Sequence, residues 1–137
     1  MGCPREVVVM AKKKNEEKEL HNYRCTLVRV IDGDTIDVDI DLGFDVWLHK
    51  QRVRLYGIDT PESRTRNKAE KVLGLKAKDF LIRLCAQEIT LVSLGKGKYG
   101  RILGIPYTHA GLNICELMIN SGNAVEYFGG KKTKVWA

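Results

Sequence analysis

The chain has 137 residues, which is the size of one domain that can bury a hydrophobic core of its own. A hydrophobic fraction of 44% and a charged fraction of 29% are near the averages of soluble globular proteins, so a disordered or fibrous class is excluded. The excess of 23 Lys and Arg over 17 Asp and Glu leaves a net charge of +6, which favours polyanions as partners.

No apolar run approaches the roughly 18 residues that a membrane-spanning helix needs. The first residues, MGCPREVVVMAKKK, contain an apolar run that is too short for a secretory signal, so we expect an intracellular protein unless a leader has been removed. The cysteines lack the spacing of zinc ligands, which indicates free thiols in a reducing compartment. They are Cys3, Cys25, Cys85 and Cys115.

The first half of the chain predicts a mobile tail followed by three strands. Residues 1–20 are charged and aperiodic, which is typical of a tail. Residues 23–31 alternate in hydropathy as a strand does, and residues 35–41 alternate strictly. Residues 46–58 form a third strand, which pairs most simply with the second as a hairpin.

The second strand has an apolar face and an acidic face. Three aspartates alternate with its apolar residues, and we interpret them as the solvent-exposed face of the strand rather than as a row of metal ligands. They are Asp37, Asp39 and Asp41. On the third strand Arg52 and Arg54 share one face, and we interpret Arg52 as a surface side chain.

The second half begins with a strongly basic loop over residues 64–71, followed by a helical pattern over residues 73–87. Gly74 makes the start of this helix ambiguous, and we place it between Ala69 and Leu75. The expected buried stripe comprises Leu73, Ala77, Phe80, Leu81 and Leu84.

A Gly-rich turn separates a fourth strand at residues 88–94 from a fifth at 101–107, and a second helix covers 112–122. The spacers between the first three strands are too short for parallel crossovers. We therefore expect a mainly β (α+β) domain over residues 21–130, with a basic tail at 131–137. Its architecture is a five-stranded barrel of the oligonucleotide-binding type with two packed helices.

Two acidic turns follow strand-like runs. Asp32 and Asp34 flank a glycine in the turn IDGDT, and Asp59 and Thr60 precede Pro61 in the loop IDTPES. Either turn alone is most often a capping structure. Both turns follow strand-like runs and have arginines close by, however, which favours a functional role over simple capping.

Four motifs in order resemble the staphylococcal nuclease family, the thermonucleases: IDGDT, RLYGIDTPE, KYGR after a Gly-rich turn, and ELMINSGNAV. The resemblance covers residues 23–128 and implies a Ca²⁺-dependent endonuclease that hydrolyses DNA and also RNA to 3′-phosphate products. We expect no counterpart of the third, C-terminal helix of the best-known member.

The resemblance implies a Ca²⁺ site made of the carboxylates of Asp34 and Asp59 and the backbone carbonyl of Thr60. Hard divalent cations prefer such oxygen ligands. Asp32 matches an outer position, where it would act through a water molecule.

The resemblance also assigns the catalytic and nucleotide-binding residues. Glu62 would be the general base that activates water, and Arg54 and Arg101 would bind the phosphate as its negative charge grows. Lys98 and Tyr99 match positions that contact the terminal nucleotide. Two aromatic positions near the nucleobase have only loose counterparts in this chain.

A second hypothesis is a catalytically silent barrel that binds nucleic acid or protein. A third is a barrel whose aspartates only cap turns. The presence of the carboxylates, the glutamate and the arginines together favours the enzyme, since a silent module has no need of all of them. We expect a nucleic-acid substrate and no membrane partner, with a monomer as the simplest oligomeric state.

Overall fold

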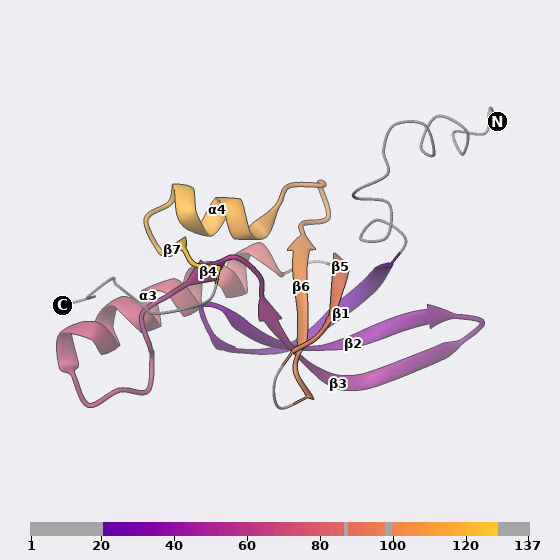
Figure 1. The fold of residues 1–137 in the computed structure, drawn as a ribbon, viewed down its shortest axis with the longest axis horizontal. Helices are drawn as coiled ribbons and strands as arrows, with labels where there is room; N and C mark the ends of the chain where they lie inside the picture. Colours follow the sequence, from indigo (N-terminus) through magenta and orange to yellow (C-terminus); the bar gives the residue numbers. More distant parts are fainter. Residues whose placement is uncertain (1–20, 87, 98–99, 129–137) are drawn as a thin grey trace.

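A computed structural model describes residues 21–86, 88–97 and 100–128, and the body of this part of the chain is a closed five-stranded barrel (Figure 1). The strand order is β1-β2-β3-β6-β5, and β1 pairs with β5 to close the barrel. All neighbouring strands are antiparallel except β3 and β6, which are parallel. The strands are β1 (Asn22–Asp32), β2 (Thr35–Gly43), β3 (Val46–Leu55), β5 (Ile89–Lys96) and β6 (Ile102–Tyr107).

The predicted barrel with two helices is therefore confirmed. The expected tails at residues 1–20 and 131–137, and the question of a C-terminal helix, lie outside the described residues. None of the described helices is long and apolar enough to cross a membrane.

The predicted third strand is wrong at its end, because the chain turns at Tyr56 and Gly57 instead of continuing to Ile58. Gly57 has φ of 85°, a left-handed conformation that glycine adopts without steric cost. After this turn β4 (Ile58–Asp59) leaves the barrel and pairs with β7 (Val125–Glu126) in a separate two-stranded sheet. The turn therefore carries Asp59 away from β3.

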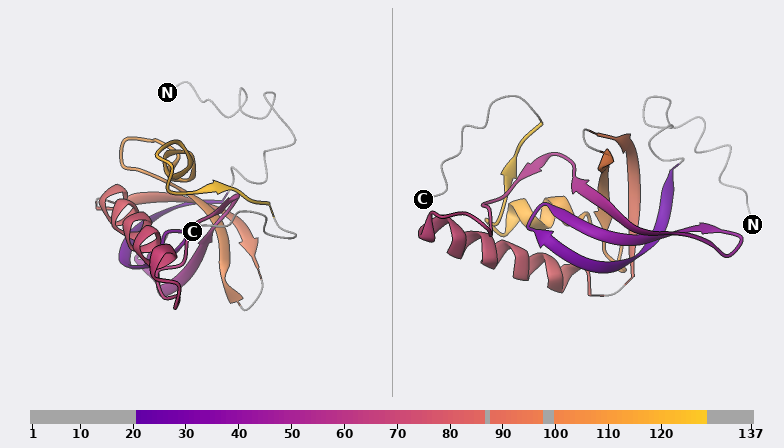
Figure 2. Two further views of the ribbon diagram at one scale, coloured as in Figure 1. Left: turned by 90° about the vertical axis from the view of Figure 1, so that its left-hand side faces the viewer. Right: turned by 90° about the horizontal axis from the view of Figure 1, so that it is seen from below.

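In the described part of the chain, two helices flank the barrel: α3 (Lys68–Leu84) and α4 (Ile114–Asn120). Each begins after an asparagine whose side chain accepts hydrogen bonds from the first turn. Helix α3 lies on the side of the barrel opposite the projecting end of the β2–β3 hairpin (Figures 1 and 2). It begins one residue before the predicted range. Leu73 does not belong to its buried stripe, because this side chain is 37% exposed.

Gly74, rather than the expected Leu73, is the buried residue at this point of α3. A Cβ atom at this position would lie 2.2 Å from the backbone carbonyl oxygen of Glu62. The helix therefore approaches the loop after β4 as closely as a backbone can, and only glycine permits that contact.

Replacing Gly74 with Ala is expected to lower the free energy of unfolding by about 1–3 kcal/mol, the usual cost of overpacking. At an exposed position inside a helix, replacing Gly with Ala would instead raise the free energy of unfolding by roughly 1 kcal/mol. Urea unfolding of the variant and of the wild type measures the change in the free energy of unfolding. Val72→Ala, at a 65% exposed position of the same helix, is the control. A Gly74→Ala protein as stable as the wild type would contradict the close contact.

The core is formed by the inward side chains of the barrel and of both helices, among them Ile36, Leu55, Leu81 and Met118. The described cysteines belong to it, and burial raises the pKa of each thiol to about 12. These thiols are Cys25, Cys85 and Cys115. They stay protonated at neutral pH, and they are free and buried, as expected for these three residues.

Asp37 is the exception on the acidic face of β2. It was expected to face solvent, but the residue is only 5% exposed. Two arginines from the neighbouring strands cover it, Arg29 on β1 and Arg52 on β3. Arg52 is an exposed side chain, as expected, but it also pairs with Asp37, which the sequence did not predict.

Candidate functional site

The two acidic turns meet, although they are about thirty residues apart in the sequence. The backbone N–H of Ser63 donates a hydrogen bond to Asp32 Oδ1 at 3.2 Å, and the Ser63 hydroxyl donates a second one to the same oxygen. A Cβ atom on Gly33 would lie 3.1 Å from Thr60 Oγ1. The turn between β1 and β2 therefore packs directly on the loop that follows β4.

Asp34 and Arg54 form a partly buried ion pair at this contact. Thr35, next to Asp34, is paired with Arg54 in the β2–β3 register. Asp34 Oδ2 lies 3.5 Å from Arg54 Nη1, and the two side chains are only 14% and 16% exposed. Limited exposure reduces screening by salt, so the attraction within this pair depends less on ionic strength than that within a surface pair.

Further hydrogen bonds orient both partners of this ion pair. The Thr35 hydroxyl donates to Asp34 Oδ1 at 3.0 Å, and Arg54 Nη1 donates to the carbonyl oxygen of Leu55 at 2.9 Å. A carboxylate has about four acceptor positions in total. Asp34 therefore keeps acceptor capacity for a further ligand.

Asp59 and Thr60 are both 4% exposed, at the point where β4 ends. Among the described residues, Thr60 Oγ1 is a buried oxygen with no hydrogen-bond partner. Burying a polar oxygen without a partner costs free energy, so this atom marks a position where a ligand or water would be stabilising.

The described residues contain no group of three or more His, Cys, Asp or Glu side chains that could hold a metal ion. The predicted cation set is smaller than this, since it has two carboxylates and one backbone carbonyl. All of its members are hard oxygen donors. A cation at this place would need water or a substrate oxygen to complete its coordination.

Glu62 follows this set in the chain, and its side chain is exposed. The loop that carries it is held by α3: the Glu62 N–H donates to Glu70 Oε2 at 3.1 Å, and its carbonyl oxygen faces Gly74. Helix α3 therefore positions the backbone of Glu62.

Ser63 and Glu70 were not singled out in the sequence, and Gly74 was noted only because it makes the start of the helix ambiguous. A glycine inside a helical pattern was the one available signal, because it indicates a close backbone approach.

Arg54 and Arg101 line the same cavity, which has a volume of about 300 Å³. The aromatic residues Tyr56, Tyr127 and Phe128 line it as well, and the rings of Tyr56 and Phe128 meet edge to face with centroids 5.5 Å apart. The cavity thus combines two guanidinium groups with apolar walls, as a ligand with an anionic part and a flat ring would require. Lys98 and Tyr99 lie outside the described residues.

The model of the staphylococcal nuclease homologue family matches residues 52–135. An Escherichia coli protein named as an uncharacterized endonuclease is 35% identical over 102 residues, which are 74% of this chain and 59% of that protein. The micrococcal nuclease of Shigella flexneri is 34% identical over 82% of this chain and 63% of its own.

The thermonuclease of Staphylococcus hyicus is 40% identical over 80 residues, which are 56% of this chain and 44% of that protein. The chain thus spans about half to three-fifths of the length of these curated relatives. Because the family model covers well over half of its residues, the chain belongs to the family of staphylococcal nuclease homologues.

Proposed function

We propose that this chain is a Ca²⁺-dependent phosphodiesterase that hydrolyses DNA, with RNA as a second substrate, and leaves 3′-phosphate ends. The names of the relatives as endonuclease, micrococcal nuclease and thermonuclease support the substrate class. The product and the cation are inferred from the resemblance to the thermonucleases.

One observation carries the proposal: Arg54 both pairs with Asp34 and lines the cavity that contains Arg101. The same guanidinium group is therefore next to one proposed cation ligand, Asp34, and next to the cavity proposed to bind the phosphate. Hydrolysis of a phosphodiester needs these two elements side by side, because a phosphate must be bound where its charge is neutralised.

Asp34, Asp59 and the Thr60 carbonyl fit a hard divalent cation, since all three offer oxygen ligands and Thr60 contributes a buried hydroxyl oxygen without a partner among the described residues. A bound Ca²⁺ would supply positive charge beside the scissile phosphate. Ser63 supports this arrangement through Asp32, because its two hydrogen bonds join the two acidic turns.

In the proposed reaction Glu62 orients a water molecule and accepts its proton. Arg54 and Arg101 donate hydrogen bonds to the non-bridging oxygens of the phosphate, where negative charge increases in the transition state. Arg101 also assists the 5′ oxygen as it leaves. The new bond joins the water oxygen to phosphorus, and the bond between phosphorus and the 5′ oxygen breaks.

The aromatic walls of the cavity suit a nucleobase. Tyr56 and Phe128 offer ring surfaces, and stacking on aromatic rings tolerates any base sequence. Lys98 and Tyr99 remain predicted contacts to the terminal nucleotide.

The test is degradation of plasmid and single-stranded DNA with Ca²⁺ or with a chelator, together with thermal unfolding. Chelation is expected to suppress cleavage. Ca²⁺ at about 100 times its dissociation constant should stabilise the fold by roughly 2.7 kcal/mol, because it binds only the folded state. This gain should be lost in Asp34→Asn.

Asp79→Asn is the control, because Asp79 is an exposed carboxylate on α3. It should keep the full Ca²⁺-dependent stabilisation. If the wild type cleaves no nucleic acid with any divalent cation, the second hypothesis of a silent binding barrel replaces this proposal.

A further inference from the structure

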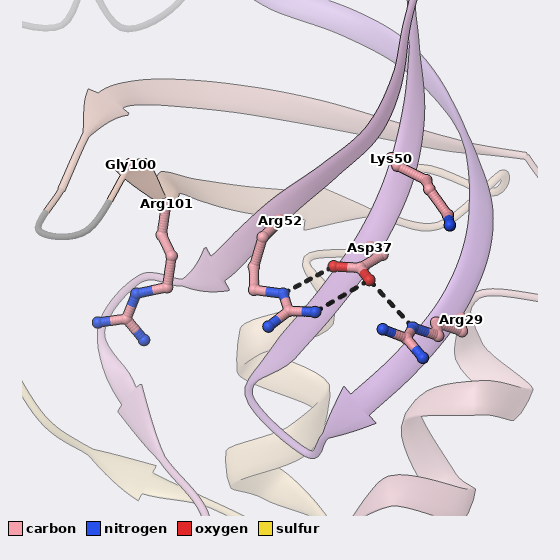
Figure 3. A pocket seen from close by; sticks show the side chains of 6 residues that line it. All are labelled: Arg29, Asp37, Lys50, Arg52, Gly100 and Arg101. Carbon is pink, nitrogen blue, oxygen red and sulfur yellow. Dashed lines mark hydrogen bonds and ion pairs between the residues drawn. The ribbon is translucent and has the colours of Figure 1, made fainter.

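A second, larger groove of about 680 Å³ lies beside the proposed catalytic cavity, on the outer face of the barrel. Basic side chains line it from β1 and β3, the strands on either side of β2, and from the residue just before β6 (Figure 3). They are Arg29, Lys50, Arg52 and Arg101. Of the described residues that line the groove, one is acidic, Asp37, so a single carboxylate opposes these four cationic side chains.

Asp37 lies between two of these arginines and holds both (Figure 3). Its Oδ1 accepts a hydrogen bond from Arg52 Nε at 2.9 Å. Its Oδ2 accepts from Arg52 Nη2 at 3.2 Å and from Arg29 Nε at 3.1 Å. The Arg52 pair is therefore bidentate, the most orientation-specific form of this contact.

The two guanidinium groups remain accessible although the carboxylate is covered. The side chains of Arg29 and Arg52 are 62% and 43% exposed, against 6% for Asp37. A guanidinium has five N–H donors, and the bonds to Asp37 use one from Arg29 and two from Arg52. Most of their donors can thus reach a ligand in the groove.

The cluster of Asp37, Arg29 and Arg52 carries a net positive charge, so it is more than a neutral ion pair within the protein. One carboxylate neutralises one arginine, and the second arginine leaves the cluster with a positive charge. Hydrogen bonds from Arg52 hold the pKa of Asp37 below its usual range, so the carboxylate is ionised at neutral pH. Side chains that are already fixed lose little conformational entropy when they bind an anion.

Arg101 connects this groove with the catalytic cavity, because it lines both. Arg52 and Arg54 lie on the same face of β3, two residues apart, and Arg54 belongs to the catalytic cavity. A strand whose scissile phosphate contacts Arg54 and Arg101 would therefore continue past Arg52.

We propose that Arg29 and Arg52, oriented by Asp37, bind a backbone phosphate of the nucleic-acid strand outside the bond that is cut. This inference rests on the proposed function for its substrate class. It adds a binding site for the polymer outside the proposed catalytic cavity. Because phosphates repeat along every strand, the contact is independent of base sequence.

The experiment measures binding with chelator present, so that affinity is observed without cleavage. Fluorescence anisotropy with a labelled single-stranded oligonucleotide and with a dinucleotide compares the double variant Arg29→Gln/Arg52→Gln with Arg24→Gln/Arg83→Gln. The control removes the same charge from two exposed arginines that do not line the groove. Each titration is repeated at several salt concentrations.

The groove variant is expected to bind the oligonucleotide more weakly than the control does. The slope of log K against log salt should fall by about 0.7 for each phosphate contact that is lost. Dinucleotide affinity should match that of the control. Equal oligonucleotide affinities and slopes in the two double variants would overturn the inference.

Asp37→Asn tests the orienting role, with thermal unfolding to confirm that the variant is folded. The substitution makes the groove more positive by one charge, so attraction by charge alone would strengthen oligonucleotide binding. Orientation by Asp37 predicts weaker binding, and stronger binding would refute that part of the inference.

These binding experiments, together with the cleavage assay, test the groove and the proposed hydrolysis separately. A wild type that binds oligonucleotide through this groove but cleaves nothing with any cation would support the groove and refute the proposed hydrolysis. Cleavage together with equal binding by both double variants would refute the groove and leave the hydrolysis standing.

Discussion

Replacing Glu62 with Gln is expected to lower the rate of DNA cleavage by about 10²–10⁴, the usual contribution of a general base. Gln has nearly the same shape but cannot accept the proton of the attacking water. The fold should survive, because the Glu62 side chain is exposed and the loop is held through its backbone contacts with Glu70 and Gly74. Single-turnover cleavage and thermal unfolding measure the two effects separately.

Glu126→Gln is the matched control, since Glu126 is an exposed glutamate on β7. It should cleave at the wild-type rate. A Glu62→Gln protein that also retains the wild-type rate would show that another group accepts the proton, and the assignment of Glu62 would have to be abandoned.

Replacing Arg54 with Lys is expected to reduce the cleavage rate by about 10²–10³, the cost of losing one positioned donor to the transition state. Lysine keeps the charge, so attraction to Asp34 and to the phosphate remains. It loses the planar pair of donors, and it cannot contact Asp34, the Leu55 carbonyl and a phosphate oxygen in the same fixed arrangement.

The measurement is kcat on a short substrate, together with KM, because a transition-state contact affects kcat more than ground-state binding. Arg24→Lys is the control, since Arg24 is an exposed arginine on β1 that pairs with Glu88. If kcat is unchanged in Arg54→Lys, charge alone suffices and the proposed paired hydrogen bonds are not part of catalysis.

Much of the fold could be predicted because the information is local. The alternation Ile36, Val38, Ile40 places three side chains on one face of β2, and all three are buried in the barrel. The helical pattern around Ala77 and Leu81 identifies α3 for the same reason. Leu73 was misplaced because periodicity does not detect that a glycine is needed at the contact with Glu62.

The proposed site was harder to predict from local hydropathy patterns than the fold was. Asp34, Asp59 and Glu62 were identified through a family resemblance, whereas Ser63 and Glu70 have no motif of their own and became visible only through their hydrogen bonds. Hydrogen bonds between segments that are far apart leave no periodic pattern.

The sequence by itself determined the alternating strands, the two acidic turns, the positive charge and the membership of the motifs in one family. Only the tertiary structure decided that the turns meet at Gly33 and Thr60, that Asp37 is covered by Arg29 and Arg52, and that Arg101 lines two cavities. The physical reason is that hydropathy patterns specify which face of an element is buried. The closure of the barrel, by pairing β1 with β5 and β3 with β6, specifies which distant side chains share that face.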